Sequence, residues 1–392
     1  MSRLLLPLAS SHRPDFVTQC CDDARDANYR FEEDLEALRH RQAPACCRGG
    51  HTQKARRHKR DRQVQQLGKG EGATAPCIVP ARPFIQNAPI NGDGAMISRE
   101  AQTEIERMFA ERKPADRPIE QRRSEWEADA LLRALPDGAR FTPVEAGGVA
   151  AEWMAMPGVV DDRVFLLLHG GGYNAGSPKT HRRLAADLSQ AIGMRVLVPD
   201  YRLAPEYPFP AGVDDAIKAY RWLASEGIPE RNIVVGGDSA GGGLALSMLL
   251  ALREAGARLP RAAVLIAPWT DLTVSSESYE RLRRRDPIIT PEGLREAGVW
   301  YAGAGDPADP LMSPLFADLT GLPPMLIHAG EDEVMVDDSR IFADRAKAAG
   351  VDITCKIFPG MWHVFHGAGT GIPEARSAID EIGVYVRSLF AR

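Results

Sequence analysis

The chain has 392 residues and a formal net charge of −5, with 44% apolar and 26% charged residues. A chain of this length and composition can bury one large core and a small appendage. The modest net charge gives no argument for binding nucleic acid or an anionic membrane, and no apolar stretch approaches the ~20 residues of a membrane span. We expect a cytoplasmic globular protein, and the sequence leaves open whether it forms a homo-oligomer.

The first 95 residues differ from the rest in composition. They hold a basic run, His51–Arg62, and five of the six cysteines, at positions 20, 21, 46, 47 and 77. Adjacent cysteine pairs lack the C-x-x-C spacing of a metal site, whereas the basic run leaves a nucleic-acid-binding arm as an alternative. Because apolar periodicity is poor, we predict that residues 1–95 are a disordered extension, or reflect a start codon assigned too early, with the working protein beginning near Met96.

Two segments lie outside the pattern of a layered α/β domain. Arg99–Leu135 is charged and helix-prone, with apolar residues recurring at three- and four-residue steps, and Asp271–Tyr301 interrupts the sequence between two predicted strands. Both fit either ordinary surface helices or a cap that roofs a site. As a cap, residues 96–140 supply N-terminal helices and an insertion at about 271–305 completes the roof. The candidate wall residues are Tyr279, Trp300 and Phe316.

The rest of the chain, residues 141–392, alternates strand-like and helix-like segments, which predicts a mostly parallel sheet with helices on both faces. It opens with an antiparallel start near Val144–Met156. The predicted strands that follow are Arg163–His169, Arg195–Tyr201, Asn232–Gly237, Ala262–Pro268, Met325–Ala329 and Ile353–Pro359. The predicted helices lie at about Pro178–Ile192, Ala211–Glu226, Ala240–Ala255, Asp337–Ala349 and Ile372–Ala391. Right-handed crossovers then place the loops after the strands at one carboxyl edge, where ligands bind in open α/β folds.

A glycine-rich loop, His169–Tyr173, directly follows an apolar strand. Glycine amides with no side chain in the way suit an oxyanion, the negative oxygen formed when a carbonyl carbon is attacked. A loop that only reverses the chain is the alternative, and a phosphate-binding loop is disfavoured because the Lys-Ser/Thr pair that it needs is absent. We assign the oxyanion donors to the amides of Gly171 and Gly172, joined by that of Ala240, and expect His169 to organise the loop.

The segment Gly237–Gly241 has the pattern G-x-S-x-G between an apolar strand and a helix-like stretch. A serine hydroxyl is a poor nucleophile at neutral pH, so it must project from a sharp strand-to-helix turn where a base can reach it. The two glycines give that turn steric room. A Gly/Ser turn can arise by chance, so the pattern needs partners elsewhere. We predict Ser239 as the nucleophile, with Arg202 and Glu206 bracing the loop beneath it.

The predicted base is His363, which lies in the first loop after the last predicted strand. A side chain there can turn back over the sheet edge toward Ser239. A lone histidine is more often structural, and His366, three residues later, competes for the same role.

The third partner is an acid between the serine and the histidine, which fixes the imidazole tautomer and stabilises the imidazolium. Asp337 and Asp338 are explained as first-turn acids that complement a helix dipole. Counting from the preceding strand picks Asp332, while counting back from the helix picks Glu333. We choose Asp332, because a short acid at a strand end is the commoner orienting residue, and Glu333 stays open.

The order serine, acid, histidine, with the glycine loop ahead of all three, is that of α/β-hydrolases. Four stretches resemble the hormone-sensitive-lipase-like esterases, also called bacterial family IV. These stretches are His169–Tyr173, Asp200–Glu206, Gly237–Gly242 and Gly360–His363. The resemblance covers roughly Ile97–Arg392 and implies an α/β-hydrolase fold with an eight-stranded, mostly parallel sheet and a helical cap. It also implies hydrolysis of short-acyl carboxylic esters without a cofactor or a metal.

The same resemblance places Ser239 and His363 on the family's nucleophile and base, and the three assigned amides on its oxyanion donors. At the acid the chain departs from the family, because Glu331–Asp337 stands where an Asp-Pro-Leu-x-Asp stretch is frequent.

We therefore predict a serine carboxylesterase that acts on a small-molecule ester through an acyl-enzyme, with neither nucleic acid nor a membrane as partner. A lactone hydrolase is one alternative, because the same groups serve a ring-opening attack. A non-catalytic ligand-binding member is another. Gibberellin receptors resemble the family but have lost the catalytic histidine, and His363 is present here.

Overall fold

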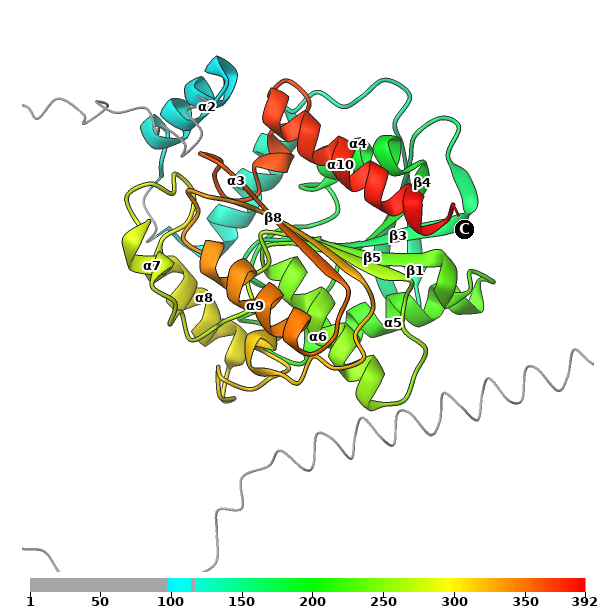
Figure 1. Cartoon of the computed structure of the whole chain (residues 1–392). Coiled ribbons are helices and arrows are strands. Elements are labelled where there is room, and N and C mark those ends of the chain that lie inside the picture. The colour runs from blue at the N-terminus through cyan, green and yellow to red at the C-terminus, as the bar shows by residue number, and fades with distance from the viewer. Residues whose placement is uncertain (1–96, 114–116, 392) are drawn as a thin grey trace, which may run out of the picture. The chain divides into compact units, whose positions relative to one another are not determined.

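The computed structural model describes residues 97–113 and 117–391. The prediction made for residues 1–95, with their cysteines and basic run, lies outside the described residues. The described part contains an eight-stranded sheet with helices on both faces and a helical cap at one edge (Figure 1).

The sheet has the strand order β1-β2-β4-β3-β5-β6-β7-β8. Its strands are β1 (Arg140–Ala146), β2 (Val149–Ala155), β3 (Val160–Leu168), β4 (Met194–Pro199), β5 (Ile233–Asp238), β6 (Ala262–Ile266), β7 (Met325–Gly330) and β8 (Ile353–Phe358). β1 and β2 pair antiparallel, β2 pairs antiparallel with β4, and all other neighbours are parallel. The predicted α/β-hydrolase architecture is confirmed, with the antiparallel start resolved into a hairpin.

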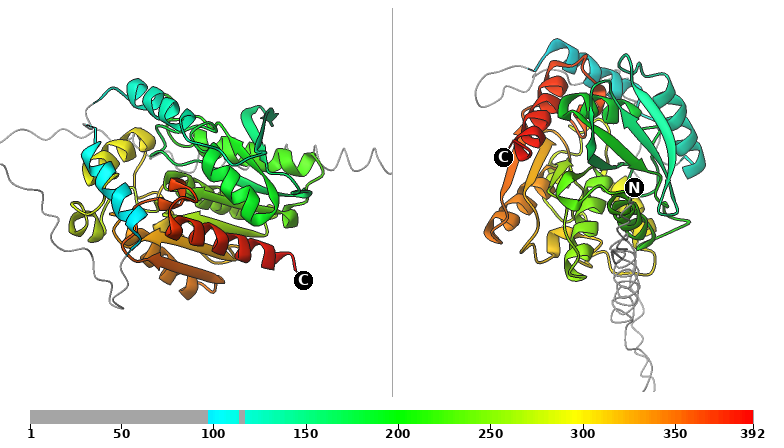
Figure 2. Two further views of the ribbon diagram at one scale, coloured as in Figure 1. Left: turned by 90° about the horizontal axis from the view of Figure 1, so that it is seen from above. Right: turned by 90° about the vertical axis from the view of Figure 1, so that its right-hand side faces the viewer.

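The central strands are apolar along their whole length because helices cover both of their faces. Every residue of β5, β6 and β7 is buried. On one face lie α4 (Arg182–Ile192) and α10 (Pro373–Leu389), and on the other lie α5 (Ala211–Ser225), α6 (Ala240–Glu254) and α9 (Val336–Ala348) (Figures 1 and 2). Among the described helices, none is both long enough and apolar enough to cross a bilayer.

The predicted helices agree with the observed ones within one or two residues, except for α4. It begins at Arg182, not at Pro178. Here Ser177 and Thr180 hydrogen-bond each other's backbone: the amide of Ser177 donates to Oγ1 of Thr180 at 2.9 Å, and the amide of Thr180 donates to Oγ of Ser177 at 3.4 Å. Such side-chain bonds hold the backbone in a turn and delay the helix.

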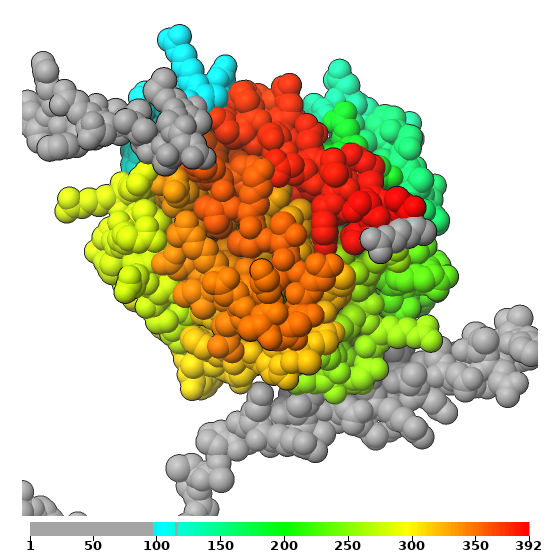
Figure 3. Space-filling view, viewed as in Figure 1, coloured from blue at the N-terminus to red at the C-terminus, as the bar shows by residue number. Residues whose placement is uncertain are grey.

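The predicted segment Arg99–Leu135 contains two helices, α2 (Arg99–Ala110) and α3 (Ile119–Leu131). Ser98 caps α2, since its hydroxyl accepts a hydrogen bond from the amide of Ala101 at 3.1 Å. The excursion between β6 and β7 contains α7 (Ser278–Arg281) and α8 (Pro291–Ala302). In the space-filling view, this excursion occupies the left and lower left of the face shown, beside the orange surface of α9 (Figure 3).

Candidate active site

Ser239 stands in a strained turn between β5 and α6. Its φ of 54° is positive, a conformation that costs a non-glycine residue about 1–3 kcal/mol and persists only where the surroundings impose it. The amide of Ser239 donates to the carbonyl of Ile266 at 2.8 Å. A Cβ on Gly237 would collide with the backbone of Gly241, and one on Gly241 would collide with the carbonyl oxygen of Leu168. The two glycines of the motif are therefore required by close backbone approach.

The glycine loop after β3 adopts backbone angles that favour glycine. Gly171 has a φ of 121° and Gly172 a φ of 61°. Among the described residues, neither of their amides donates a hydrogen bond within the protein. Two adjacent unpaired amides are suited to stabilise an anionic oxygen.

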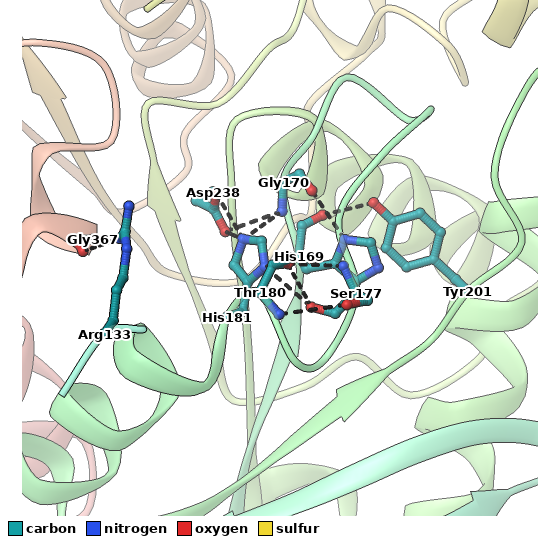
Figure 4. A network of polar contacts seen from close by, with 9 residues as sticks. All are labelled: Arg133, His169, Gly170, Ser177, Thr180, His181, Tyr201, Asp238 and Gly367. Atoms are coloured by element: carbon teal, nitrogen blue, oxygen red, sulfur yellow. Dashed lines mark hydrogen bonds and ion pairs between the residues drawn. The ribbon is translucent and has the colours of Figure 1, made fainter. Parts of the chain in front are cut away.

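A buried polar network lies beneath this loop (Figure 4). Asp238, the residue before the nucleophile, accepts hydrogen bonds from the amide of Gly170 at 3.2 Å and lies 3.2 Å from Nε2 of His181. Burial works to raise the pKa of the Asp238 carboxyl, but the neighbouring histidines, His181 above all, outweigh it and lower that pKa. The acid is thus held as a carboxylate under Gly170.

His169 supports the loop from the other side, as predicted. Its Nδ1 lies 3.0 Å from the carbonyl oxygen of Gly170, and its ring stacks on Tyr201 with ring centroids 4.1 Å apart. The hydroxyl of Tyr201 donates to the carbonyl of His169 at 2.6 Å. Burial lowers the pKa of His169 to about 3, so this imidazole stays neutral and takes no part in proton transfer.

His363 lies buried in the loop after β8, with Nδ1 3.4 Å from Oε2 of Glu333. This is an ion-pair distance, longer than a well-formed hydrogen bond, and contacts of this kind tighten when a substrate is bound. The same Oε2 accepts a hydrogen bond from the amide of Gly330 at 3.3 Å, which holds the carboxylate in place.

The structure does not bring Asp332, the acid chosen from the sequence, to the histidine. Oδ2 of Asp332 accepts a hydrogen bond from Nη2 of Arg285 at 2.7 Å. After β7 the backbone turns, and the amide of Asp332 bonds the carbonyl of Met361, so the Asp332 carboxylate faces the cap insertion. Of the two acids that the sequence left open, Glu333 is the one beside His363.

The charges around His363 favour its protonated form. Burial alone lowers the pKa of this imidazole, but the carboxylates of Glu333, Asp286 and Asp238 together outweigh burial and raise it above the usual value. Asp286 is a buried acid of the cap insertion that accepts hydrogen bonds from the amides of Ile288 and Val334, at 2.8 and 3.0 Å. A pKa above the ordinary value suits a group that must accept a proton during attack.

His366, the competing histidine, points away into the core. Its Nε2 lies 3.3 Å from Nδ1 of His328 on β7. Burial lowers the pKa of His366 well below the ordinary value, so it is a neutral packing residue.

The cap segments contact the loops that carry the catalytic groups. Ile97 and Ala101, at the start of α2, pack in one apolar cluster with Trp362 and Phe365, which flank the histidine. From α3, Nε of Arg123 donates to the carbonyl of Asn174 in the glycine loop at 2.7 Å.

The cap insertion contacts the loop that carries the acids. Ser278 donates its hydroxyl to the carbonyl of Val334 at 2.6 Å. Asp338 on α9 is fully buried and accepts hydrogen bonds from the amides of Thr270 and Asp271, at 2.9 and 3.0 Å, and from the hydroxyl of Tyr279 at 2.9 Å. Asp338 therefore does more than complement a helix dipole, because it ties the insertion to the acid loop.

The three aromatic residues expected to line the site lie in different surroundings. Tyr279 is fully buried and holds Asp338, so it supports the cap from inside. Phe316 is 42% exposed in a short 3₁₀ turn. Trp300 lies under the guanidinium of Arg122 at 5.3 Å. Of the two bracing residues, Glu206 bonds Arg123 and Arg202 bonds Asp215.

The supporting residues of the site were not predicted from the sequence. They are Arg123, His181, Arg285 and Asp286. Their partners lie far away along the chain; His181 and Asp238, for example, are 57 positions apart. The one local signal was at Asp286, where the amides of Ile288 and Ile289 both bond the carboxylate in a side-chain turn. Without the fold, no spacing in the sequence connects these residues to the nucleophile.

A strained serine turn, a buried histidine and acid pair, and a glycine loop with unpaired amides define a serine hydrolase on an α/β sheet. Comparison with known proteins agrees. Residues 165–367 match the family model described as alpha/beta hydrolase fold. The chain is 44% identical over 245 residues to an acetyl-hydrolase of Streptomyces hygroscopicus, which covers 62% of this chain and 82% of that protein. It is 36% identical over 265 residues to an esterase of Acinetobacter venetianus, covering 67% and 87%.

Solved structures give the same result. An esterase from the bacterial hormone-sensitive lipase family superposes with a TM-score of 0.73 at 41% identity, covering 75% of this chain and 99% of that one. The chain therefore belongs to the alpha/beta hydrolase fold family, and within it to the bacterial hormone-sensitive lipase group. It is a carboxylic ester hydrolase, as its sequence predicted.

Proposed function

We propose that the chain hydrolyses short-chain carboxylic esters through an acyl-enzyme formed on Ser239. His363 takes the serine proton during attack and then gives it to the leaving alcohol. Water activated by the same imidazole releases the acid. We assign the orienting acid to Glu333 in place of Asp332, since Glu333 is within ion-pair distance of Nδ1 and Asp332 is bound to Arg285. The contact between Glu333 and His363 is the observation that carries this proposal.

The amides of Gly171, Gly172 and Ala240 are proposed to stabilise the tetrahedral oxyanion. The first two are unpaired within the described part of the chain, and Ala240 follows the nucleophile at the first position of α6. Amide dipoles aimed at a developing charge in a site that excludes water are worth more than in solvent. The dipole of α6 adds to the same effect, because its positive end faces the serine.

The preference for a short acyl chain rests on how closely the cap approaches the glycine loop. A Cβ on Gly171 would lie 2.8 Å from the Trp126 ring of α3, and one on Gly172 would lie 3.4 Å from the Cβ of Ala297 on α8. The loop is therefore enclosed from two sides. A relative is named an acetyl-hydrolase, and crystals of the esterase EstE5, 38% identical with a TM-score of 0.72, were soaked with p-nitrophenyl butyrate.

The test is hydrolysis of p-nitrophenyl esters from acetyl to palmitoyl by the full chain and by Ser239→Ala. We expect the highest kcat/KM for acyl chains of two to four carbons, and a loss of ~10⁴ to 10⁶ in kcat for the variant. Ser247→Ala is the matched control, because within the described residues the buried hydroxyl that it removes bonds only the carbonyl of Gly243 on the same helix. Near-normal hydrolysis by Ser239→Ala would refute the nucleophile, and a maximum at long chains would refute the substrate class.

A cytoplasmic location and self-association stay predictions. Fractionation of the producing cells tests the first, and light scattering of the purified chain tests the second.

A further inference from the structure

The cap helix α3 contacts the glycine loop through two side chains one turn apart. Trp126 approaches Gly171 and also lies against the ring of His181, with ring centroids 5.8 Å apart. Arg123, three residues earlier, projects from the same side of the helix toward the carbonyl of Asn174. The loop that carries the proposed oxyanion donors is thus held between the buried network around Asp238 and a helix of the cap.

Within the part of the chain that the structure describes, the guanidinium of Arg123 makes four hydrogen bonds, and they reach two different loops. Nε donates to the carbonyl of Asn174 at 2.7 Å and Nη2 to the carbonyl of Ala204 at 2.8 Å. Nη1 and Nη2 also donate to the two carboxylate oxygens of Glu206, each at 2.8 Å. The two loops are already joined, since the amide of Ala204 donates to the carbonyl of Tyr173 at 2.9 Å.

The bonds to the carbonyls matter more than the ion pair. Glu206 is 45% exposed at its side chain, so water weakens its pairing with Arg123 even though both carboxylate oxygens are bonded. A planar guanidinium that satisfies two carbonyls in fixed directions is different, because it sets the distance between the loops. Asn174 lies three residues after Gly171, and its amide donates to the carbonyl of Gly171 at 3.1 Å. A shift of Asn174 therefore moves the peptide unit that joins the carbonyl of Gly171 to the amide of Gly172.

We infer that Arg123 is a positioning residue of the oxyanion hole: by holding the carbonyls of Asn174 and Ala204, it fixes the orientation of the Gly171 and Gly172 amides. The inference rests on the proposed role of those amides. It makes the contacts of Arg123, on α3, a support of the groups that stabilise the oxyanion. Small displacements of preorganised donors reduce the rate steeply, whereas they change the binding of the ground state little.

The experiment compares the steady-state kinetics of p-nitrophenyl acetate hydrolysis by the full chain with those of four variants. Arg123→Met removes all four hydrogen bonds but keeps an apolar stem, and we expect kcat to fall roughly 10- to 100-fold with KM changed less than about threefold. Arg123→Lys keeps the charge but cannot satisfy both carbonyls, so an intermediate loss is expected. Glu206→Gln leaves the carbonyl bonds in place, and its kcat should stay within about threefold of the original.

Arg122→Met is the matched control. Arg122 is the neighbouring arginine on α3, and it contacts the cap insertion through Trp300 and Glu296, at 5.3 and 3.4 Å. This variant loosens α3 without touching the glycine loop. We expect it to retain kcat within about threefold. Melting temperatures of all variants show whether each is folded.

A second readout isolates the oxyanion hole. A phenylboronic acid forms a tetrahedral adduct on the serine that places a boron-bound oxygen near the amides, so its inhibition constant should rise with the loss in kcat across the Arg123 variants. A folded Arg123→Met variant with kcat within twofold of the original overturns the inference. An equal loss in Arg122→Met also overturns it, because cap docking in general would then be the cause.

If Arg123→Met does not fold, the pair Arg123→Lys and Glu206→Gln decides, and equal kcat values for the two overturn the inference. Labelling of the original chain by a fluorophosphonate, absent in Ser239→Ala, tests the proposed function separately. Equal labelling of the original chain and Ser239→Ala refutes Ser239 as the nucleophile. If Ser239 is labelled normally but the Arg123 variants keep the original kcat, only the positioning role of Arg123 is refuted.

Discussion

Replacing Glu333 by Gln separates the two candidate acids of the triad. In the transition state of attack His363 becomes an imidazolium, and its Nδ1 lies 3.4 Å from the Glu333 carboxylate. At an effective dielectric constant of about 20, two unit charges at this separation attract by about 5 kcal/mol. Losing that attraction lowers kcat by roughly 10³- to 10⁴-fold, which is the scale on which removal of the orienting acid acts in serine proteases.

The companion variant is Asp332→Asn. Asp332 pairs with Arg285, whose side chain is 47% exposed, and such a pair contributes about 0–1 kcal/mol. We expect kcat within about tenfold of the original. The assay is the initial rate of p-nitrophenyl acetate hydrolysis, with circular dichroism to confirm folding. A large loss in Asp332→Asn with a small one in Glu333→Gln would reverse the assignment of the acid.

The pH profile gives a second readout on the same pair. Carboxylates raise the pKa of His363, so the acid limb of kcat/KM in the original chain lies above the ordinary histidine value. Removing the Glu333 charge lowers that pKa, and the acid limb moves to lower pH. Asp332→Asn leaves the limb nearly unchanged. A limb that stays in place in Glu333→Gln would show that the carboxylate does not act on the imidazole.

Two further variants test the supporting structure. Gly241→Ala places a Cβ against the carbonyl oxygen of Leu168. We expect the free energy of unfolding, measured in urea, to fall by at least the ~1–3 kcal/mol that overpacking a core costs. A free energy of unfolding equal to that of the original chain would contradict the close approach. Burial raises the pKa of Asp338 to about 8, above its value in the unfolded chain, so its contribution to stability is present at low pH and is lost as pH rises toward 8. Asp338→Asn should flatten the fall of the melting temperature between about pH 4 and 8, and an unchanged slope counts against this.

The sequence predicted the sheet and the tight turn at Ser239 because both depend on local signals. Long apolar runs mark β5, β6 and β7, and the spacing of Gly237, Ser239 and Gly241 follows from one tight turn. The acid of the triad was harder to predict from the sequence. A shift of one residue in the turn after β7 decides whether Asp332 or Glu333 faces the histidine. Turn geometry of that kind depends on long-range bonds.

The cap shows the same limit more clearly. The segments that contain its helices were predicted, but the residues that these helices contact were not. Arg123 bonds the carbonyl of Asn174, 51 positions away, and Asp338 bonds the amide of Thr270, 68 positions away. A single sequence contains no periodic signal for such pairs. Tyr279 illustrates the consequence, since an aromatic residue in a cap segment was expected at the substrate and instead hydrogen-bonds the buried carboxyl group of Asp338.

The attachment of the cap segments to the catalytic loops links selectivity to turnover. A change in α2 alters the support of the histidine, and a change in α3 alters that of the oxyanion donors. A change in the insertion alters the support of the acid and the packing against Gly172. Variation that adapts this roof to a new alcohol or acyl group must therefore be accompanied by compensating changes beneath it. Libraries that randomise residues 97–131 should be built together with their contacts at Asn174, Ala204 and Trp362, because exchanging the cap alone would yield proteins that bind the new ester and turn it over slowly.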